Sequence, residues 1–173
     1  MALGKDYVTQ DCSLARALEI VGERWTLLIV RDALYGVRRF GQFLTHLEIP
    51  RAVLSARLQA LVDVGVMTKD DGGYVLTEVG RELWPVVHTL ARWADRNFAD
   101  EGPTRLFFHV PCGERIEGDG KCPACGREAP VEELEMRPGP GLNPRRDDPV
   151  SVALRRPHRL LEPIASGDPA KTG

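Results

Sequence analysis

Apolar residues return at helical spacing along the first part of the chain and predict three helices. In residues 12–21 apolar side chains fall at every third or fourth position, which is typical of an amphipathic helix. Residues 25–34 are apolar almost all round and form a run too long for a typical strand, so we expect a central buried helix there. The apolar side chains of residues 39–47 again share one side and predict a shorter helix.

A fourth helix is predicted directly afterwards, over residues 51–64. Pro50 suits the start of this helix because a first-turn N–H has no partner within the helix. Leu54, Leu58 and Leu61 form an inward stripe, and the opposite face is small and polar. Two helices joined by so short a link predict a helix-turn-helix.

A hairpin and a last helical region follow. The sequence Asp70-Asp71-Gly72-Gly73 separates two short apolar segments, and its glycines can adopt the positive φ of a tight turn. Thr77 is expected to cap a helical region that extends to Phe98 and that Pro85 must kink or divide. The predicted fold class is therefore a winged helix-turn-helix, mainly α with a small β wing.

An apolar stripe on the last helical region predicts self-association. This region is longer than the core of so small a domain requires, and an exposed apolar stripe ordinarily marks a partner surface. We expect a homodimer interface made by Leu83, Val86, Val87, Leu90 and Trp93.

Two knuckles in the second half of the chain predict a metal site. Each knuckle has two potential metal ligands separated by two residues, and a glycine follows the second ligand. The knuckles are His109-Val110-Pro111-Cys112-Gly113 and Cys122-Pro123-Ala124-Cys125-Gly126. This spacing lets both side chains face one ion, which predicts one structural Zn²⁺ per chain held by His109, Cys112, Cys122 and Cys125. A disulfide between Cys122 and Cys125, a redox dithiol or chance spacing are the alternatives, and His109 could instead point outward from a strand.

Composition divides the chain into three parts. Three of the four cysteines lie between residues 104 and 137, and Pro and Gly become frequent from residue 138. We expect a DNA-binding and dimerisation domain over residues 1–100 and a zinc-ribbon-like module over residues 104–137. Residues 138–173 are expected to form a mobile tail, because such a composition is typical of disordered segments.

Charge and hydropathy limit the classes of protein to which this chain can belong. The net charge of −2 favours no partner by itself, but four arginines gather between residues 38 and 57 against the single acid Glu48. No run of 18 apolar residues is present, which excludes a transmembrane helix. The start of the chain lacks a secretory apolar segment, so we expect a cytoplasmic protein without a membrane partner.

The outer face of the predicted helix over residues 51–64 is the candidate reader of DNA. Small side chains there let the helix backbone approach the major groove, while Arg, Ser and Gln can bond to base edges or phosphates. The expected DNA-binding residues are Arg38, Arg39, Arg51, Ala52, Ser55, Ala56, Arg57 and Gln59. Helix-turn-helix geometry also serves protein contacts, so the pattern alone leaves both uses open.

Several spaced motifs over about residues 7–98 carry a family resemblance. They are Cys12-Ser13-Leu14, Glu23-Arg24-Trp25-Thr26-Leu27-Leu28-Ile29, Arg38-Arg39-Phe40, Leu54-Ser55-Ala56-Arg57-Leu58, and Tyr74-Val75-Leu76-Thr77 with Gly80. In this order they resemble the HxlR-type winged-helix regulators of bacteria. The resemblance implies a homodimeric DNA-binding transcription factor whose recognition helix lies in residues 51–64 and whose first and last helices make dimer contacts.

The resemblance also bears on the wing and on Cys12. The predicted wing is shorter and more acidic than is usual in the family, which argues against a wing contact with phosphate. Some HxlR-type proteins respond to oxidants or electrophiles through a cysteine near this position, so the resemblance extends the role of redox sensor to Cys12. An inert, partly buried thiol is the alternative.

These features together predict a sequence-specific transcriptional regulator that acts as a homodimer on double-stranded DNA, most simply as a repressor that occupies a promoter. The alternative is a winged-helix plus zinc-ribbon interaction module of the transcription machinery. Four protein ligands leave no open position on the metal, and the chain contains no nucleotide-binding loop or nucleophile motif, so we expect no enzyme activity. The sequence identifies no effector.

Overall fold

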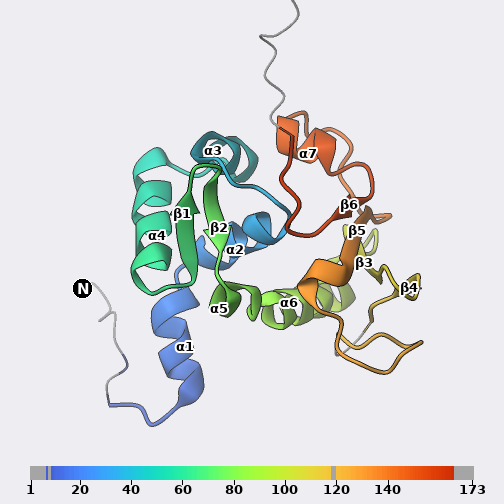
Figure 1. Ribbon diagram of the computed structural model, residues 1–173, viewed down its shortest axis with the longest axis horizontal. Coiled ribbons are helices and arrows are strands. Elements are labelled where there is room, and N and C mark those ends of the chain that lie inside the picture. Colours follow the sequence, from blue (N-terminus) through green and yellow to red (C-terminus); the bar gives the residue numbers. More distant parts are fainter. Residues whose placement is uncertain (1–6, 8, 118–119, 166–173) are drawn as a thin grey trace, which may run out of the picture.

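The computed structural model describes residue 7, residues 9–117 and residues 120–165 of the 173-residue chain (Figure 1). Its helices are α1 (Ser13–Val21), α2 (Thr26–Leu34), α3 (Phe40–Leu47), α4 (Arg51–Asp63), α5 (Glu78–Arg81), α6 (Trp84–Phe98), the 3-10 turn η1 (Val131–Glu133) and α7 (Pro149–Ala153). Its strands are β1 (Met67–Asp70), β2 (Gly73–Leu76), β3 (Arg105–His109), β4 (Glu114–Arg115), β5 (Leu134–Pro138) and β6 (His158–Arg159). Within these ranges, none of the helices combines the length and the apolar character needed to cross a bilayer.

The N-terminal half is a winged helix built around α2. This helix contacts α3, α4, α6 and β2, and its Ile29, Val30 and Leu34 have no exposed surface. The predicted first four helices are confirmed with boundaries that differ by no more than one residue, because their apolar periodicity and their glycine and proline stops agree. The predicted fold class is confirmed as well.

The wing and the last helical region also follow the predicted signals. Strands β1 and β2 pair antiparallel from Met67 with Leu76 to Asp70 with Gly73, and Gly73 has a φ of 120°. Thr77 caps the next helix by accepting a hydrogen bond from the N–H of Gly80. Pro85 stands in the first turn of α6, so it divides the helical region into α5 and α6 and does not kink it.

A second sheet shares its core with the winged helix. Its strand order is β4-β3-β5-β6, with every pair antiparallel. Phe107 on β3 is buried, and its ring meets Trp84 of α6 edge-on at 4.7 Å between centroids and lies 6.3 Å from the ring of Tyr35. Apolar side chains of the sheet thus join the core of the winged helix, so residues 104–137 do not form a separately packed module.

The expectation of a mobile tail from residue 138 is wrong for residues 138–165. This segment completes β5, forms α7 and β6, and buries Val150, Leu154, Leu160 and Ile164. These four apolar anchors are set among prolines and glycines, so the local composition resembles a disordered segment while the burial is that of a folded one. Residues 166–173 of the predicted tail lie outside the described residues.

The end of the described chain is hydrogen-bonded to the link between α2 and α3. The N–H of Leu161 donates to the carbonyl of Leu34 at 2.8 Å, and the N–H of Ile164 donates to the carbonyl of Gly36 at 3.0 Å. Gly36 has a φ of 88°, and a Cβ at this position would lie 1.7 Å from the carbonyl oxygen of Glu162. Glycine is therefore required at residue 36 both by the turn and by the close approach of the C-terminal segment.

Candidate DNA-binding surface and metal centre

Helices α3 and α4 are joined by a three-residue turn that fixes the helix-turn-helix. Glu48 ends α3 in the left-handed conformation, with a φ of 53°. Ile49 is buried beneath the turn, and Pro50 stands directly before α4. The turn is thus anchored by an apolar side chain and needs no flexible loop to orient α4.

The predicted recognition face of α4 is exposed. Leu54, Leu58 and Leu61 are buried in the winged-helix core, which turns the opposite face of the helix outward. The exposed residues among those predicted to bind DNA on this helix are Arg51, Ala52, Ser55, Ala56 and Gln59.

The longer polar side chains beside this face already have intramolecular contacts. The guanidinium of Arg51 lies over the ring of Phe40 at 5.2 Å, and Arg57 lies 3.6 Å from a carboxylate oxygen of Glu23. Gln59 donates to the carboxylate of Asp63 at 2.7 Å. These contacts hold the side chains along the helix without covering Ala52 and Ala56.

Arg38 and Arg39 precede α3 and differ in their surroundings. Arg39 is exposed at the first turn of α3. Arg38 is half-buried: its guanidinium donates to the carbonyl of Leu161, and its own carbonyl accepts from the N–H of Tyr74 on β2. Arg38 therefore links the wing to the C-terminal segment through hydrogen bonds. Its charge alone did not predict this structural role.

The tip of the wing is acidic and compact. The carboxylate of Asp70 accepts a hydrogen bond from the N–H of Gly72 at 2.7 Å, which closes the turn. A Cβ at Gly73 would lie 2.3 Å from the carbonyl oxygen of Arg38, so the strand passes the link to α3 at a distance that only glycine allows. Negative charge at this tip disfavours contact with a phosphate backbone.

The two knuckles adopt the same backbone turn. In the first, the N–H groups of Cys112 and Gly113 both donate to the carbonyl of His109, and Gly113 has a φ of 72°. In the second, the N–H of Gly126 donates to the carbonyl of Cys122, and Gly126 has a φ of 70°. The glycine after each second ligand supplies the positive φ that brings the two ligands of the turn together.

The four predicted ligands converge on one point. The ligand atoms of His109, Cys112, Cys122 and Cys125 all lie within 4.8 Å of one another, and Cys125 Sγ is 3.7 Å from His109 Nδ1. His109 faces inward and is buried, so the alternative in which it points outward is wrong. All four cysteines are free thiols in this structure. The cluster could hold a metal ion, and its three sulfurs and one nitrogen match the donors that Zn²⁺ prefers.

Neighbouring groups orient the His109 ring and favour the thiolate form of Cys122. His109 Nε2 lies 2.7 Å from a carboxylate oxygen of Glu133, which raises the pKa of His109 and leaves Nδ1 directed at the sulfurs. Burial opposes ionisation of Cys122, but the N–H groups of Cys125 and Ala124 and the His109 ring lower its pKa to about 6. A carboxylate partner that orients a ligating imidazole is a common feature of protein metal sites.

Comparison with known proteins agrees with the helix-turn-helix. Residues 20–102 match the family described as HxlR-like helix-turn-helix. The HTH-type transcriptional regulator Mb3122 of Mycobacterium bovis is 44% identical over 138 residues, which cover 75% of this chain and 87% of that protein. The HTH-type transcriptional regulator Rv3095 of Mycobacterium tuberculosis gives the same identity and coverage.

The chain belongs to the HxlR-like helix-turn-helix family. It is a transcriptional regulator with a helix-turn-helix domain, which is not an enzyme class. The crystal structure of the transcription-factor candidate PA1607 is 36% identical, with a TM-score of 0.50, and the match covers 76% of this chain and 87% of PA1607. The mycobacterial alignments exceed the length of residues 20–102, so similarity to HxlR-like proteins continues beyond the winged helix.

The predicted dimer stripe is largely exposed in the single chain. Leu83 and Val87 are half-buried, whereas Val86, Leu90 and Trp93 are each 49% exposed. Exposed apolar side chains of α1, namely Leu14, Leu18 and Ile20, add to the apolar surface of the monomer. A monomeric protein seldom leaves so many large apolar groups in water.

Cys12 is exposed directly before α1. The guanidinium of Arg16, one turn later, lies 3.1 Å from the carboxylate of Glu19. The alternative of a partly buried thiol does not hold, and the sensor role of Cys12 stays a prediction.

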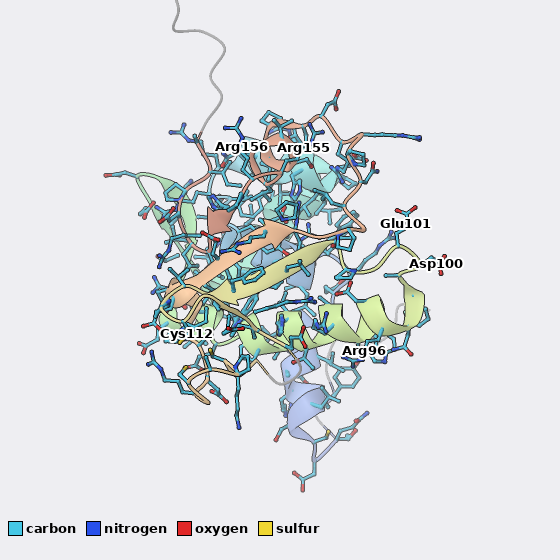
Figure 2. The ribbon with its side chains drawn as sticks, turned by 90° about the vertical axis from the view of Figure 1, so that its right-hand side faces the viewer. Arg96, Asp100, Glu101, Cys112, Arg155 and Arg156 are labelled. Carbon is cyan, nitrogen blue, oxygen red and sulfur yellow. The ribbon has the colours of Figure 1, made fainter. Side chains whose placement is uncertain are left out.

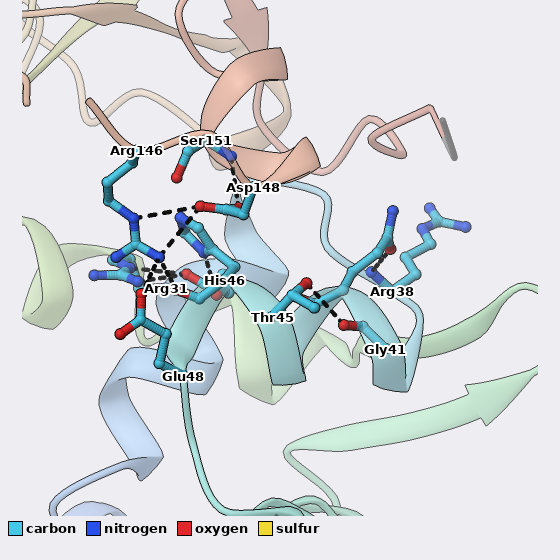
Figure 3. Close-up of polar contacts among 11 residues, drawn as sticks. Arg31, Arg38, Gly41, Thr45, His46, Glu48, Arg146, Asp148 and Ser151 are labelled. Carbon is cyan, nitrogen blue, oxygen red and sulfur yellow. Dashed lines mark hydrogen bonds and ion pairs between the residues drawn. The ribbon is translucent and has the colours of Figure 1, made fainter. Parts of the chain in front are cut away.

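A buried polar network is the feature that sequence reasoning missed. Asp32 on α2 has no exposed surface and accepts from Arg31 at 2.6 Å, while its other oxygen lies 2.7 Å from Nδ1 of His46 on α3. Figure 3 shows Arg146 and Asp148 of the segment before α7 reaching toward His46, whose carbonyl accepts from Arg146. The signal was available: Asp32 is an acid within an otherwise apolar helix, and such a residue needs a buried partner.

Proposed function

We propose that the chain is a sequence-specific, homodimeric repressor that acts in the cytoplasm by occupying promoter DNA through α4. The observation that carries the proposal is the exposed outer face of α4, which is small and polar while the inner face is fixed by three buried leucines. A helix held in this way can enter the major groove without reorganisation of the domain.

The residues of this face suggest a division of roles. Ala52 and Ala56 lack bulk and let the helix backbone approach the groove, while Ser55 and Gln59 are suited to base edges. Arg39 and Arg51 are exposed cations suited to phosphate. Arg57 would add a phosphate contact if it leaves Glu23, and Arg38 would act chiefly by positioning the wing.

Self-association would place two copies of α4 on one face of DNA. The exposed apolar residues of α6 and α1 support this arrangement, since a two-fold interface buries the same surface on both subunits. Recognition helices about one helical turn apart, ~34 Å, would read an inverted repeat with centres ~10 base pairs apart or a multiple of that.

The metal centre would hold one structural Zn²⁺ per chain. Four protein ligands close the coordination sphere, so the ion would stabilise the knuckles and take no part in chemistry. Protons compete with the ion for the three sulfurs and the imidazole, so its affinity is expected to fall in acid.

Replacing Arg51 by Ala is expected to weaken operator binding and to lower its salt dependence. An exposed arginine that neutralises one phosphate contributes about one unit to the slope of log K against log[salt]. The operator is first selected from genomic fragments, and affinity is then measured by fluorescence anisotropy over a series of salt concentrations.

Arg115→Ala is the matched control for this measurement. Arg115 lies on β4, on the opposite side of the molecule from α4 in Figure 1, so its removal should leave the slope unchanged. Unchanged operator affinity in a variant that lacks both Arg51 and Arg57 would contradict DNA recognition by α4. Failure of the metal-loaded protein to bind any duplex would instead favour the interaction-module function.

A sensor role for Cys12 predicts a response that depends on this thiol alone. Mild diamide should change operator affinity in the wild type and leave Cys12→Ser unaffected, because Cys12 is exposed and distant in sequence from the knuckles. Zinc content is measured in the same samples. An equal response of both proteins would assign the effect to the cysteines of the metal centre and contradict the sensor role.

A further inference from the structure

A cavity of about 320 Å³ lies where the winged helix meets the C-terminal extension. Its walls come from α2, α3, α6, β3 and the segment around residues 141–151. Pockets that hold small organic molecules start at about this volume. The cavity is separate from both the recognition face of α4 and the metal centre.

Positive groups dominate the lining of the cavity. Four arginines line it, and Asp95 is the only carboxylate among the lining residues. Arg31 is paired with Asp32, and Arg146 with Asp148. The other two, Arg92 and Arg105, are less well satisfied.

Arg92 and Arg105 have unused capacity for an anion. Arg92 reaches Asp95 only at 4.0 Å, and its buried Nε has no hydrogen-bond partner within the described part of the chain. Arg105 donates to the carbonyl of Leu154, and no carboxylate of the described residues pairs with it. Burial is the main cause of the lowered pKa of Arg105, which reflects the cost of holding a guanidinium away from water.

His88 on α6 adds an unpaired donor to the same cavity. It is 1% exposed and lines the cavity, yet neither ring nitrogen has a hydrogen-bond partner among the residues that the structure describes. Burial, together with Arg92 and Arg115, lowers the pKa of His88 to about 4, so the ring is neutral at pH 7 and carries one N–H. A buried polar group without a partner is costly, and a ligand that accepts this N–H would remove the cost.

The rest of the lining combines polar residues with apolar and aromatic ones. Phe107, Ala91 and Leu142 contribute carbon surface, and the ring of His88 meets that of Phe107 edge-on at 5.5 Å. Trp84 stacks on His88 at 5.0 Å and also meets Phe107 at 4.7 Å, so the three rings pack against one another. A flat apolar group would pack against these walls while its charged end meets the arginines.

We propose that this cavity binds a small organic carboxylate with a flat apolar body, whose carboxylate is held by Arg92, Arg105 and His88. The ligand would bridge α2 and α6 of the winged helix to the 141–151 segment. Its effect on DNA binding rests on the proposed function, whereas its binding to the free protein does not. The cavity thereby provides a site at which a metabolite of this class could act as effector.

Calorimetric titration of the full-length, metal-loaded protein with benzoate tests the site without DNA. We expect saturable binding of one benzoate per chain, with benzamide at least about tenfold weaker because it lacks the charge that the arginines recognise. Arg92→Gln should weaken benzoate binding at least about tenfold. The matched control is Arg96→Gln. Arg96 lies one turn further along α6, and its side chain is exposed and does not line the cavity (Figure 2).

His88→Phe provides a second variant with two opposite expected effects. It keeps the ring contacts with Trp84 and Phe107 but removes the unpaired nitrogens, so the melting temperature should rise while benzoate affinity falls. Absence of saturable binding at millimolar benzoate would overturn the proposal. So would equal affinity for benzamide, or an equal loss in Arg96→Gln and Arg92→Gln.

The selected operator is then titrated with and without benzoate. A change in operator affinity that Arg92→Gln abolishes is the expected result for a regulatory site. Benzoate binding with unchanged operator affinity would overturn the regulatory role while supporting the cavity as a binding site. Loss of operator binding in all conditions, with intact benzoate binding, would count against the proposed function and not against the site.

Discussion

Cys122→Ser is expected to release the metal ion and to destabilise the C-terminal half of the chain. Cys122 has no exposed surface and shares the metal centre with three other ligands, so a hydroxyl there leaves a tetrahedral site incomplete. Loss of a structural metal is among the few single changes that cost about 4 kcal/mol or more. For a chain of this size such a loss lowers the melting temperature by roughly 8–16 °C.

The measurement combines metal analysis with thermal unfolding. Wild-type protein purified under reducing conditions should contain about one zinc ion per chain and lose it to a chelator with a similar fall in melting temperature. Cys12→Ser is the matched control, because Cys12 lies outside the cluster and should keep the ion. Reduced wild-type protein without zinc, or Cys122→Ser that retains it, would contradict the metal centre.

Leu90→Asp is expected to convert the proposed dimer into monomers and to abolish tight binding to a full operator. Leu90 is 49% exposed in the single chain, so the substitution should not disturb the monomer fold. In a dimer it would bury an unpaired carboxylate. Loss of the second half-site then removes the gain from linked binding, roughly 10²–10⁴ in affinity.

Sedimentation and operator titration measure the two effects together. Affinity for an isolated half-site should change little, which separates loss of the dimer from damage to α4. Val152→Asp on α7 is the control, because Val152 is an apolar residue of similar exposure outside the predicted stripe. Wild-type protein that is a monomer at micromolar concentration and still binds one unrepeated site tightly would argue against the homodimer.

The elements that the sequence predicted correctly are those whose signals are local. These signals act within a few residues: they are helix periodicity, the stops at Gly36 and Pro50, and the turn glycines. The first four helices and the wing lie where these signals predicted them. The knuckles were equally readable, because two residues between ligands and a following glycine specify the turn completely.

The elements that were missed depend on contacts between distant parts of the chain. Val150 and Leu160 belong to short apolar stretches between prolines and arginines, and only the surface presented by α3, β5 and the α2–α3 link makes them anchors. The cavity arises likewise from residues far apart in sequence, so neither His88 nor Arg105 carried a recognisable pattern. Sequence motifs therefore predicted the helix-turn-helix and the residues of the candidate metal cluster, but not the packing of the two halves against each other.

The hydrogen bonds between residues 160–164 and the α2–α3 link affect how the chain can be divided. The same link carries Arg38, whose carbonyl accepts from β2 of the wing and whose guanidinium donates to the carbonyl of Leu161. Phe107 of β3 packs with Trp84 and Tyr35 at the junction of the two halves. Cutting the chain after residue 100 would expose Trp84 and Tyr35 and remove the partners of Leu34 and Gly36. The two halves should therefore melt in one cooperative transition, and exchange of the helix-turn-helix between relatives would require the matching C-terminal half.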